Sequence, residues 1–264
     1  MTSEILITKR DGTKVPLDLD KLHKVIFHAC EGITGVSPSQ VELNSSISFY
    51  EGITSSEIQE TMIKSAVDLI CEETPNYQLV AGRLISYHLR KVAFNQFEPP
   101  ALIDVVKQNV AHKMYEPKLL EWFSEAEYKQ LDAWIDHDRD STFTYAAMEQ
   151  FRGKYLVQDR YTKTIYETPQ IAMMLIGATL FHNYPTDTRM KWIREFYDSV
   201  SKFEISLPTP VMAGVRTSVR QFSSCVLIET DDSLDSINAT AAAVVKYVSK
   251  RAGIGIGAGA IRAL

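Results

Sequence analysis

Cys225 is the residue best suited to redox or nucleophilic chemistry. It follows two serines in the run 223–228 (Ser-Ser-Cys-Val-Leu-Ile), whose β-branched and aliphatic residues predict a buried strand. The other cysteines, Cys30 and Cys71, fall on apolar faces of predicted helices, where a thiol usually behaves as a small buried hydrophobic group. From the residues alone, a redox or nucleophilic role for Cys225 and a structural role both stay open.

A glycine-rich segment, 252–259, could bring the backbone close to a ligand. Glycines permit the close approach of a phosphate, and they also permit the positive φ angles of a tight turn. The segment follows a predicted helix and not a strand, and no Gly-Lys-Ser/Thr follows it. That context excludes a Walker loop and leaves little support for a dinucleotide-binding fingerprint. Ligand contact and turn geometry therefore both stay open.

Alternating aspartates in the segment 136–140 (Asp-His-Asp-Arg-Asp) are typical of the start of a calcium-binding loop. The sixth and twelfth positions of that loop require Gly and Glu, but here they are Ser141 and Ala147. The six histidines show no metal-ligand spacing. We therefore predict a solvated segment that caps helices, and no metal site.

Composition limits the classes of function. The chain has 264 residues, 45% hydrophobic and 23% charged, which predicts a soluble globular protein of one large or two ordinary domains. A net charge of -5 argues against a nucleic-acid-binding protein but allows binding of a free nucleotide. We expect no secretory signal and no membrane span, since the longest apolar run, 171–181, is too short. Three cysteines without a CxxC motif favour the cytoplasm.

The first hundred residues predict a β-hairpin and four helices. The hairpin pairs 5–8 with 14–17 around an Asp-Gly turn. Helix signals follow in order: an apolar face over 22–29, Ser-Pro at 37–38, a Thr-Ser-Ser-Glu capping box at 54–57, and Thr-Pro at 74–75 for a helix running to Lys91. The paired prolines at 99–100 end this unit.

The rest of the chain predicts helices and then a small α/β element. The helices are expected at 101–114, 124–136, 169–181 and 188–202, with a hairpin between 154–157 and 164–166. After residue 210 come a strand at 223–228, a helix at 233–251 and the glycine turn, which predict the opening unit of a larger α/β domain.

A set of motifs occurs in order along the chain. They are Ile7-Thr8-Lys9-Arg10-Asp11-Gly12 with Leu19-Asp20-Lys21, then Leu207-Pro208-Thr209-Pro210, Ser223-Ser224-Cys225-Val226-Leu227, Asp232-Ser233-Leu234-Asp235-Ser236-Ile237 and Arg251-Ala252-Gly253-Ile254-Gly255. The first pair resembles an ATP-cone, the nucleotide-sensing module of ribonucleotide reductases. The ordered set resembles, from end to end of the chain, the large catalytic subunit of class I ribonucleotide reductases.

The resemblance implies a mainly α fold with small β elements (α+β). Residues 1–95 would form an ATP-cone, with a small β-hairpin over a four-helix bundle. Residues 96–220 would form a helical domain, and residues 221–264 the first strand and helix of a ten-stranded α/β barrel that the sequence leaves incomplete.

The resemblance also implies a reaction, the reduction of a ribonucleoside diphosphate at its 2′ carbon by thiyl-radical chemistry. Cys225 matches one thiol of the reducing pair, and a thiol on a rigid strand could reach a ribose and later close a disulfide. Thr209, Ser224 and Gly253 match positions that contact the substrate, mostly its phosphates.

Two effector sites are implied as well. The activity site for ATP or dATP matches Lys9, Val15, Pro16, Leu17, Asp18, Leu19, Asp20, Lys21, Ser55 and Lys91, where lysines would bind phosphates near a helix N-terminus. The specificity site for deoxynucleoside triphosphates matches Asp232, Ser233, Leu234 and Arg262. Asp232 would bind deoxyribose hydroxyls and Arg262 the phosphates.

Some residues depart from the family pattern. Ser55 stands where threonine is common, and Gln59 replaces a histidine, so that we expect weaker base or phosphate contacts there. Gly257 and Ala260 replace larger polar residues in the glycine-rich segment, which bears on its loop conformation.

The implied partners are a second large subunit, a small radical-generating subunit that contains the metal, and thioredoxin or glutaredoxin as the reductant. No cofactor is expected to bind this chain directly, and no nucleic acid or membrane is expected as a partner. The radical cysteine, the second reducing cysteine, the catalytic carboxylate and asparagine, and the C-terminal shuttle cysteines have no counterparts in the sequence. We therefore expect the chain alone to be inactive, either as a fragment or as half of a split subunit that a second polypeptide completes.

Two other functions stay open at this point. A free-standing ATP-cone protein could sense nucleotides without catalysis, but it would have no use for the set Thr209, Ser224, Cys225 and Gly253. The third hypothesis is a helical scaffold in which the motifs occur by coincidence.

Overall fold

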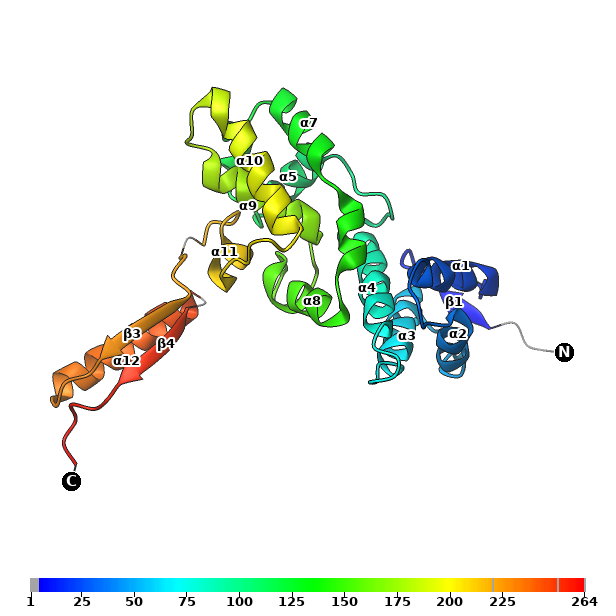
Figure 1. The fold of residues 1–264 in the computed structure, drawn as a ribbon, viewed down its shortest axis with the longest axis horizontal. Helices are drawn as coiled ribbons and strands as arrows, with labels where there is room; N and C mark the ends of the chain where they lie inside the picture. The colour runs from blue at the N-terminus through cyan, green and yellow to red at the C-terminus, as the bar shows by residue number, and fades with distance from the viewer. Residues whose placement is uncertain (1–4, 220, 251, 264) are drawn as a thin grey trace. The chain divides into compact units, whose positions relative to one another are not determined.

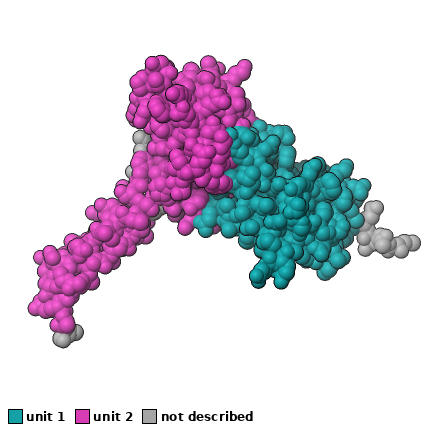
Figure 2. Space-filling model, in the orientation of Figure 1, with its two compact units in different colours: residues 1–99, 136–153 teal, residues 100–135, 154–264 magenta. Residues whose placement is uncertain are grey.

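The structure, a computed structural model, describes residues 5–219, 221–250 and 252–263. The chain divides into two compact units, shown in different colours in Figure 2. Unit 1 comprises Met1–Pro99 and Asp136–Gly153, and unit 2 comprises Pro100–Ile135 and Lys154–Leu264. The sequence-based domain boundaries at residues 95 and 220 stay predictions.

Unit 1 opens with the predicted hairpin. Strands β1 (Leu6–Thr8) and β2 (Lys14–Pro16) pair antiparallel, with Leu6 opposite Pro16 and Thr8 opposite Lys14. Gly12 closes the turn at a φ of 84°, a conformation that favours glycine. The Asp-Gly signal is thereby confirmed.

Four helices follow the hairpin, as predicted: α1 (Leu19–Cys30), α2 (Pro38–Ser46), α3 (Ser55–Val67) and α4 (Tyr77–Phe94). Ile26, Val41, Met62 and Leu84, one from each helix, are fully buried and form a shared apolar core. The unit also includes the 3-10 helix η1 (His137–Thr142) and helix α8 (Tyr145–Gln150), neither of which was predicted.

The aspartate segment is one of these missed elements. Asp136 is the N-cap of η1, and its carboxylate accepts a hydrogen bond of 3.1 Å from the amide of Asp138. Among the described residues, no group of three or more His, Cys, Asp or Glu side chains is arranged to hold a metal ion.

The capping box that begins α3 is present in both directions. The Thr54 hydroxyl accepts a hydrogen bond from the Glu57 amide, and the Glu57 carboxylate accepts one from the Thr54 amide. At the start of α2, by contrast, the Ser37 side chain makes no capping hydrogen bond. The two N-caps therefore offer a matched comparison.

We expect Thr54→Ala to destabilise α3 by about 1 kcal/mol, because it leaves helix donors without their side-chain acceptor. Hydrogen exchange of α3 amides in the full chain measures the loss. Ser37→Ala should change exchange in α2 much less, since no side-chain bond is removed there. Equal effects of the two substitutions would contradict the assignment.

Unit 2 begins with six α-helices. They are α5 (Leu102–Ala111), α6 (Leu119–Trp122), α7 (Glu125–Trp134), α9 (Pro169–Phe181), α10 (Thr186–Ser201) and α11 (Thr209–Gly214). Helix α9 is buried on all sides over 169–179, which explains its continuous apolar sequence. None of the helices in the described ranges combines the length and apolar composition that crossing a bilayer requires.

The predicted hairpin between 154–157 and 164–166 is wrong in its first strand. Helix α8 continues into a π-helical segment, η2 (Phe151–Tyr155), so that the first residues of the expected strand are helical. Only an isolated antiparallel bridge, between Gln158 and Ile165, forms where the hairpin was expected. The turn around it is closed by Asp159, whose carboxylate accepts from the amides of Tyr161 and Thr162.

Unit 2 ends in a βαβ element, β3 (Cys225–Glu229), α12 (Leu234–Ser249) and β4 (Gly253–Gly257) (Figure 1). The two strands are parallel, with Cys225 opposite Gly253 and Glu229 opposite Gly257. The strand and helix were predicted, and Arg251, at the end of the predicted helix, lies outside the described residues. The result is a mainly helical fold with small sheets, as expected for a cone, a helical domain and the start of a barrel.

The glycine-rich segment is a strand, so the predicted turn is wrong. Glycine and isoleucine alternate with the two-residue period of a strand, and this period was overlooked because glycine usually marks turns. The glycines also make room for the neighbouring strand: a Cβ at Gly255 would lie 2.7 Å from the Leu227 side chain. The expected burial of β3 is wrong as well, because Cys225 is exposed and Leu227 is 82% exposed.

Candidate functional site

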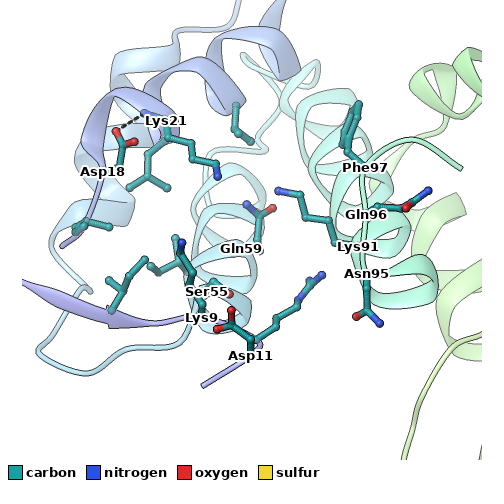
Figure 3. Close-up of a pocket in the computed structure, with 16 residues that line it drawn as sticks. Lys9, Asp11, Asp18, Lys21, Ser55, Gln59, Lys91, Asn95, Gln96 and Phe97 are labelled. Carbon is teal, nitrogen blue, oxygen red and sulfur yellow. Dashed lines mark hydrogen bonds between the residues drawn. The ribbon is translucent and has the colours of Figure 1, made fainter. Parts of the chain in front are cut away.

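A cavity of ≈ 730 Å³ lies in unit 1 between the hairpin, α1, the start of α3 and the end of α4 (Figure 3). Its lining residues are Ile7, Lys9, Arg10, Asp11, Leu17, Asp18, Lys21, Leu22, Val25, Ser55, Ile58, Gln59, Lys91, Asn95, Gln96 and Phe97. The cavity thus has both a charged set and an apolar set of side chains, the combination typical of a small-molecule site.

Four cations line the cavity: Lys9, Arg10, Lys21 and Lys91. Within the described residues, none of the four forms an ion pair with a carboxylate. The pKa of Lys91 is lowered, first by burial and then by the positive charges of Lys21 and Arg10. Because these cations repel one another, an anion bound between them would lower the electrostatic energy of all four side chains.

The two carboxylates of the cavity are held by other groups. Asp11 accepts hydrogen bonds from the hydroxyl and the amide of Thr13, which lower its pKa. Asp18 is the N-cap of α1 and accepts a bond of 2.9 Å from the Lys21 amide. Both carboxylates keep their negative charge, and the charge of Lys9 also lowers the pKa of Asp11. Four cations against two carboxylates still leave the cavity with a net positive charge that favours an anion.

The N-terminus of α3 also faces the cavity through Ser55, the first residue of the helix. The unpaired amides of a first helical turn carry partial positive charge and favour anions. The Glu57 carboxylate in this turn is bound back to Thr54 and does not line the cavity. A hydroxyl and a helix end therefore reinforce the lysines.

Gln59 lies between Lys21 and Lys91 in the centre of the cavity (Figure 3). It is 8% exposed, and its Oε1 atom is buried without a hydrogen-bond partner among the described residues. A buried amide oxygen without a partner costs free energy unless a ligand or water supplies a donor. Apolar walls complete the site, with Leu17, Leu22 and Phe97 offering surfaces for a base.

Six of the ten residues predicted for the activity site line this cavity: Lys9, Leu17, Asp18, Lys21, Ser55 and Lys91. Val15 and Pro16 lie on β2 outside it, and Leu19 and Asp20 line a separate cavity between α1 and α2. Five further residues of the lining were not predicted as site residues: Arg10, Asp11, Asn95, Gln96 and Phe97. Asn95 ends α4 with a φ of 56°, and an asparagine after a helix was the available signal that the chain turns there.

Predicted substrate residues also meet in the βαβ element. Cys225 pairs with Gly253 across the two strands, and the Gly253 amide donates a 2.8 Å hydrogen bond to the Ser224 carbonyl. The Cys225 thiol is free and exposed. Thr209 is the first residue of α11, and no hydrogen bond between described residues joins it to the other three.

The residues predicted for the specificity site lie at the other end of the strands. Asp232 Oδ2 lies 2.9 Å from Arg262 Nε. Ser233 is the N-cap of α12 and accepts from the Ser236 amide at 3.1 Å, while Leu234 is 79% exposed. The acid and the arginine are therefore neighbours before any ligand is bound.

His88 lies on α4, one turn before Lys91, with its Nε2 atom 3.4 Å from Glu60 Oε1. Burial lowers the pKa of His88 to about 4, and the attraction of Glu60 offsets only part of this effect. The same carboxylate accepts a 2.7 Å bond from Arg152 Nη1, so that Glu60 joins α3, α4 and the segment after α8.

We expect unit 1 to lose stability in mild acid. A histidine whose folded pKa is lowered stabilises the fold above its unfolded pKa of about 6.5, and this contribution is lost as pH falls towards 4. Neutral His88 should contribute about 2 kcal/mol less at pH 5 than at pH 7.5. Hydrogen exchange of α4 amides measures this loss of stability. Tryptophan fluorescence would not report on it, because the three tryptophans lie in unit 2.

A matched pair of variants isolates His88 from other titrating groups. His88→Gln should reduce the pH dependence of exchange in α4 without abolishing it, because burial also lowers the pKa of His137, in the same unit, to about 4. His23→Gln, at an exposed histidine of the same unit, should leave the dependence intact. An unchanged pH profile in His88→Gln would refute the assignment.

Comparison with known proteins agrees with this geometry. Three family models match the chain in order: the ATP cone domain over residues 5–92, the ribonucleotide reductase all-alpha domain over 141–220, and the ribonucleotide reductase barrel domain over 223–264. The chain belongs to the ribonucleotide reductase large-subunit family. It corresponds to an N-terminal portion of such a subunit.

Individual relatives support the assignment. The chain is 59% identical over 264 residues to ribonucleoside-diphosphate reductase 1 subunit alpha of Escherichia coli, and 58% identical over 264 residues to the subunit alpha of Haemophilus influenzae. It is 46% identical over 259 residues to the subunit alpha of Enterobacteria phage T4. The first two matches cover 100% of this chain and 35% of the relative, and the phage match 98% and 34%. This ribonucleotide reductase chain therefore spans only 35% of the length of its bacterial relatives.

Proposed function

We propose that this chain provides the nucleotide-sensing cone and the first substrate-facing elements of a ribonucleoside-diphosphate reductase. The cationic cavity of unit 1 carries the proposal, because four cations that outnumber two carboxylates, a helix N-terminus and apolar walls fit a nucleoside triphosphate. ATP and dATP are the proposed ligands. The proposed domains are the cone at 1–95, the helical domain at 96–220 and the barrel start at 221–264.

The proposed reaction reduces a ribonucleoside diphosphate at its 2′ carbon. The 2′ hydroxyl leaves as water, and two thiols are oxidised to a disulfide as the carbon gains two electrons. Cys225 is proposed as one of these thiols, which its exposed position on β3 supports. Ser224, Gly253 and Thr209 are proposed to contact the substrate, and Asp232, Ser233, Leu234 and Arg262 to bind a deoxynucleoside triphosphate effector.

The partners belong to the same proposal. They are a polypeptide that carries the second reducing thiol and the rest of the barrel, a second large subunit, a small subunit that supplies the radical, and thioredoxin or glutaredoxin in the cytoplasm. A stand-alone nucleotide sensor is less favoured, because a sensor has no use for a cysteine-bearing βαβ element, and the curated relatives are named as reductase subunits.

Reconstitution tests the proposal. Mixing the chain with a polypeptide that carries the rest of the subunit and with an active small subunit should yield CDP reduction. Isothermal titration of the chain alone with ATP should show binding at the cone. Absence of CDP reduction with an active small subunit would refute the reductase role, whereas absence of ATP binding would refute the sensor role.

A further inference from the structure

A buried ion pair in unit 2 has no part in the chemistry described so far. Arg216 and Glu167 are both fully buried, and the guanidinium faces the carboxylate with two contacts, one of them 2.8 Å between Arg216 Nε and Glu167 Oε2. Removing two charges from water is unfavourable unless good geometry and further hydrogen bonds offset the lost hydration. A pair of this kind therefore adds little net stability, but it fixes the relative positions of the segments that it joins.

The pair joins four segments of unit 2. Arg216 Nη1 donates to the Met212 carbonyl at 2.6 Å, and Arg216 Nη2 donates to the Tyr155 carbonyl at 2.9 Å. Glu167 accepts from the Tyr115 hydroxyl and from the Val157 amide, both at 2.5 Å. We call these two residues and Tyr115 the buried clamp.

The clamp fixes the helix that carries Thr209. Met212 lies in α11, a helix of only six residues (Thr209–Gly214), which has too few internal hydrogen bonds to be stable by itself. Glu167 directly precedes Thr168, the N-cap of the buried helix α9. The clamp therefore ties the short helix α11 to the start of a helix that cannot move without disturbing the core.

We propose that Arg216 and Glu167 are positioning residues that hold α11, and with it Thr209, in place for binding the substrate's phosphates. This inference rests on the proposed substrate role of Thr209. It predicts that loosening the clamp weakens substrate binding more than it slows turnover, since the reacting thiol lies on β3 and not on α11.

Two substitutions of graded severity test the inference. Arg216→Lys keeps the charge opposite Glu167 but cannot reach both carbonyls, because lysine lacks the planar fork of donors. Tyr115→Phe removes one hydrogen bond to Glu167 without leaving an unpaired charge. Tyr128→Phe is the matched control: Tyr128 is equally buried in unit 2, but its hydroxyl donates to the Leu119 carbonyl and not to a residue of the clamp.

In the reconstituted reductase, we expect Arg216→Lys to raise KM for CDP about tenfold with a much smaller change in kcat. Tyr115→Phe should raise KM less, and Tyr128→Phe should leave it unchanged. A purely structural role would lower the fraction of active enzyme, and so kcat, at constant KM. Unchanged KM in both clamp variants would overturn the inference.

Hydrogen exchange of the chain alone gives a second, independent readout. Exchange of the α11 amides should become faster in both clamp variants, whereas the buried helix α9 stays protected. If Arg216→Lys does not fold, the results for Tyr115→Phe alone test the inference. If the wild-type mixture lacks turnover, the proposed function fails, and exchange in α11 still tests the clamp. Unchanged exchange in α11 in a folded clamp variant would overturn the inference.

Discussion

Cys225→Ser is expected to abolish ribonucleotide reduction in the reconstituted enzyme. A serine hydroxyl is slightly smaller than the thiol and cannot form a disulfide, so that the two electrons required at the 2′ carbon are no longer available. Removing a residue that reacts covalently typically costs on the order of 10⁴-fold or more in turnover. The measurement is the rate of dCDP formation from CDP with excess reductant.

The control for this experiment is another exposed cysteine of the same chain. Cys71 lies in unit 1 after the end of α3 and is exposed, so that the prediction of a buried thiol on a helix is wrong for this residue. Its sulfur is 3.0 Å from the Thr74 hydroxyl. Cys71→Ser should retain nearly full turnover, and both variants should bind ATP as the wild type does. Residual turnover of Cys225→Ser above a few per cent would contradict the assignment of Cys225 to the reducing pair.

Fold class and most helices could be predicted because their signals are local. A capping box at residue 54, proline at the start of α9 and the Asp-Gly turn each depend on a few adjacent residues. The helices η1 and α8 were not predicted, because they have no comparable local signal. They are six residues each, too short for an apolar period, and α8 is held by tertiary contacts with α4.

The strand β4 shows a second limit of prediction from the sequence. Glycine is a poor strand former, and its presence at 253, 255 and 257 concealed the alternation with isoleucine. The parallel partner of β4 lies more than twenty residues earlier, beyond the range of local pattern analysis. Of the site itself, the lysines were proposed from the resemblance. The turn at Asn95 had a local signal, but the elements that Phe97 meets after this turn depend on tertiary packing.

Substitutions of the lysines in the cavity of unit 1 are expected to weaken nucleotide binding strongly. Lys9→Met and Lys91→Met each remove a cation that would form a charge-assisted hydrogen bond to phosphate, worth about 1.5–3 kcal/mol. We therefore expect each substitution to weaken ATP binding about 10- to 100-fold, as measured by isothermal titration of the chain. Methionine keeps the apolar stem of lysine, so that packing around the cavity changes little.

The matched control is Lys64→Met. Lys64 is an exposed lysine in the last turn of α3, outside the cavity, and its loss should leave the affinity for ATP unchanged. Inorganic triphosphate should compete with ATP in the wild type but much less in the cavity variants, because the lysines act on phosphate and not on the base. Equal affinities for ATP in Lys91→Met and Lys64→Met would mean that the uncompensated charge of this cavity serves another ligand.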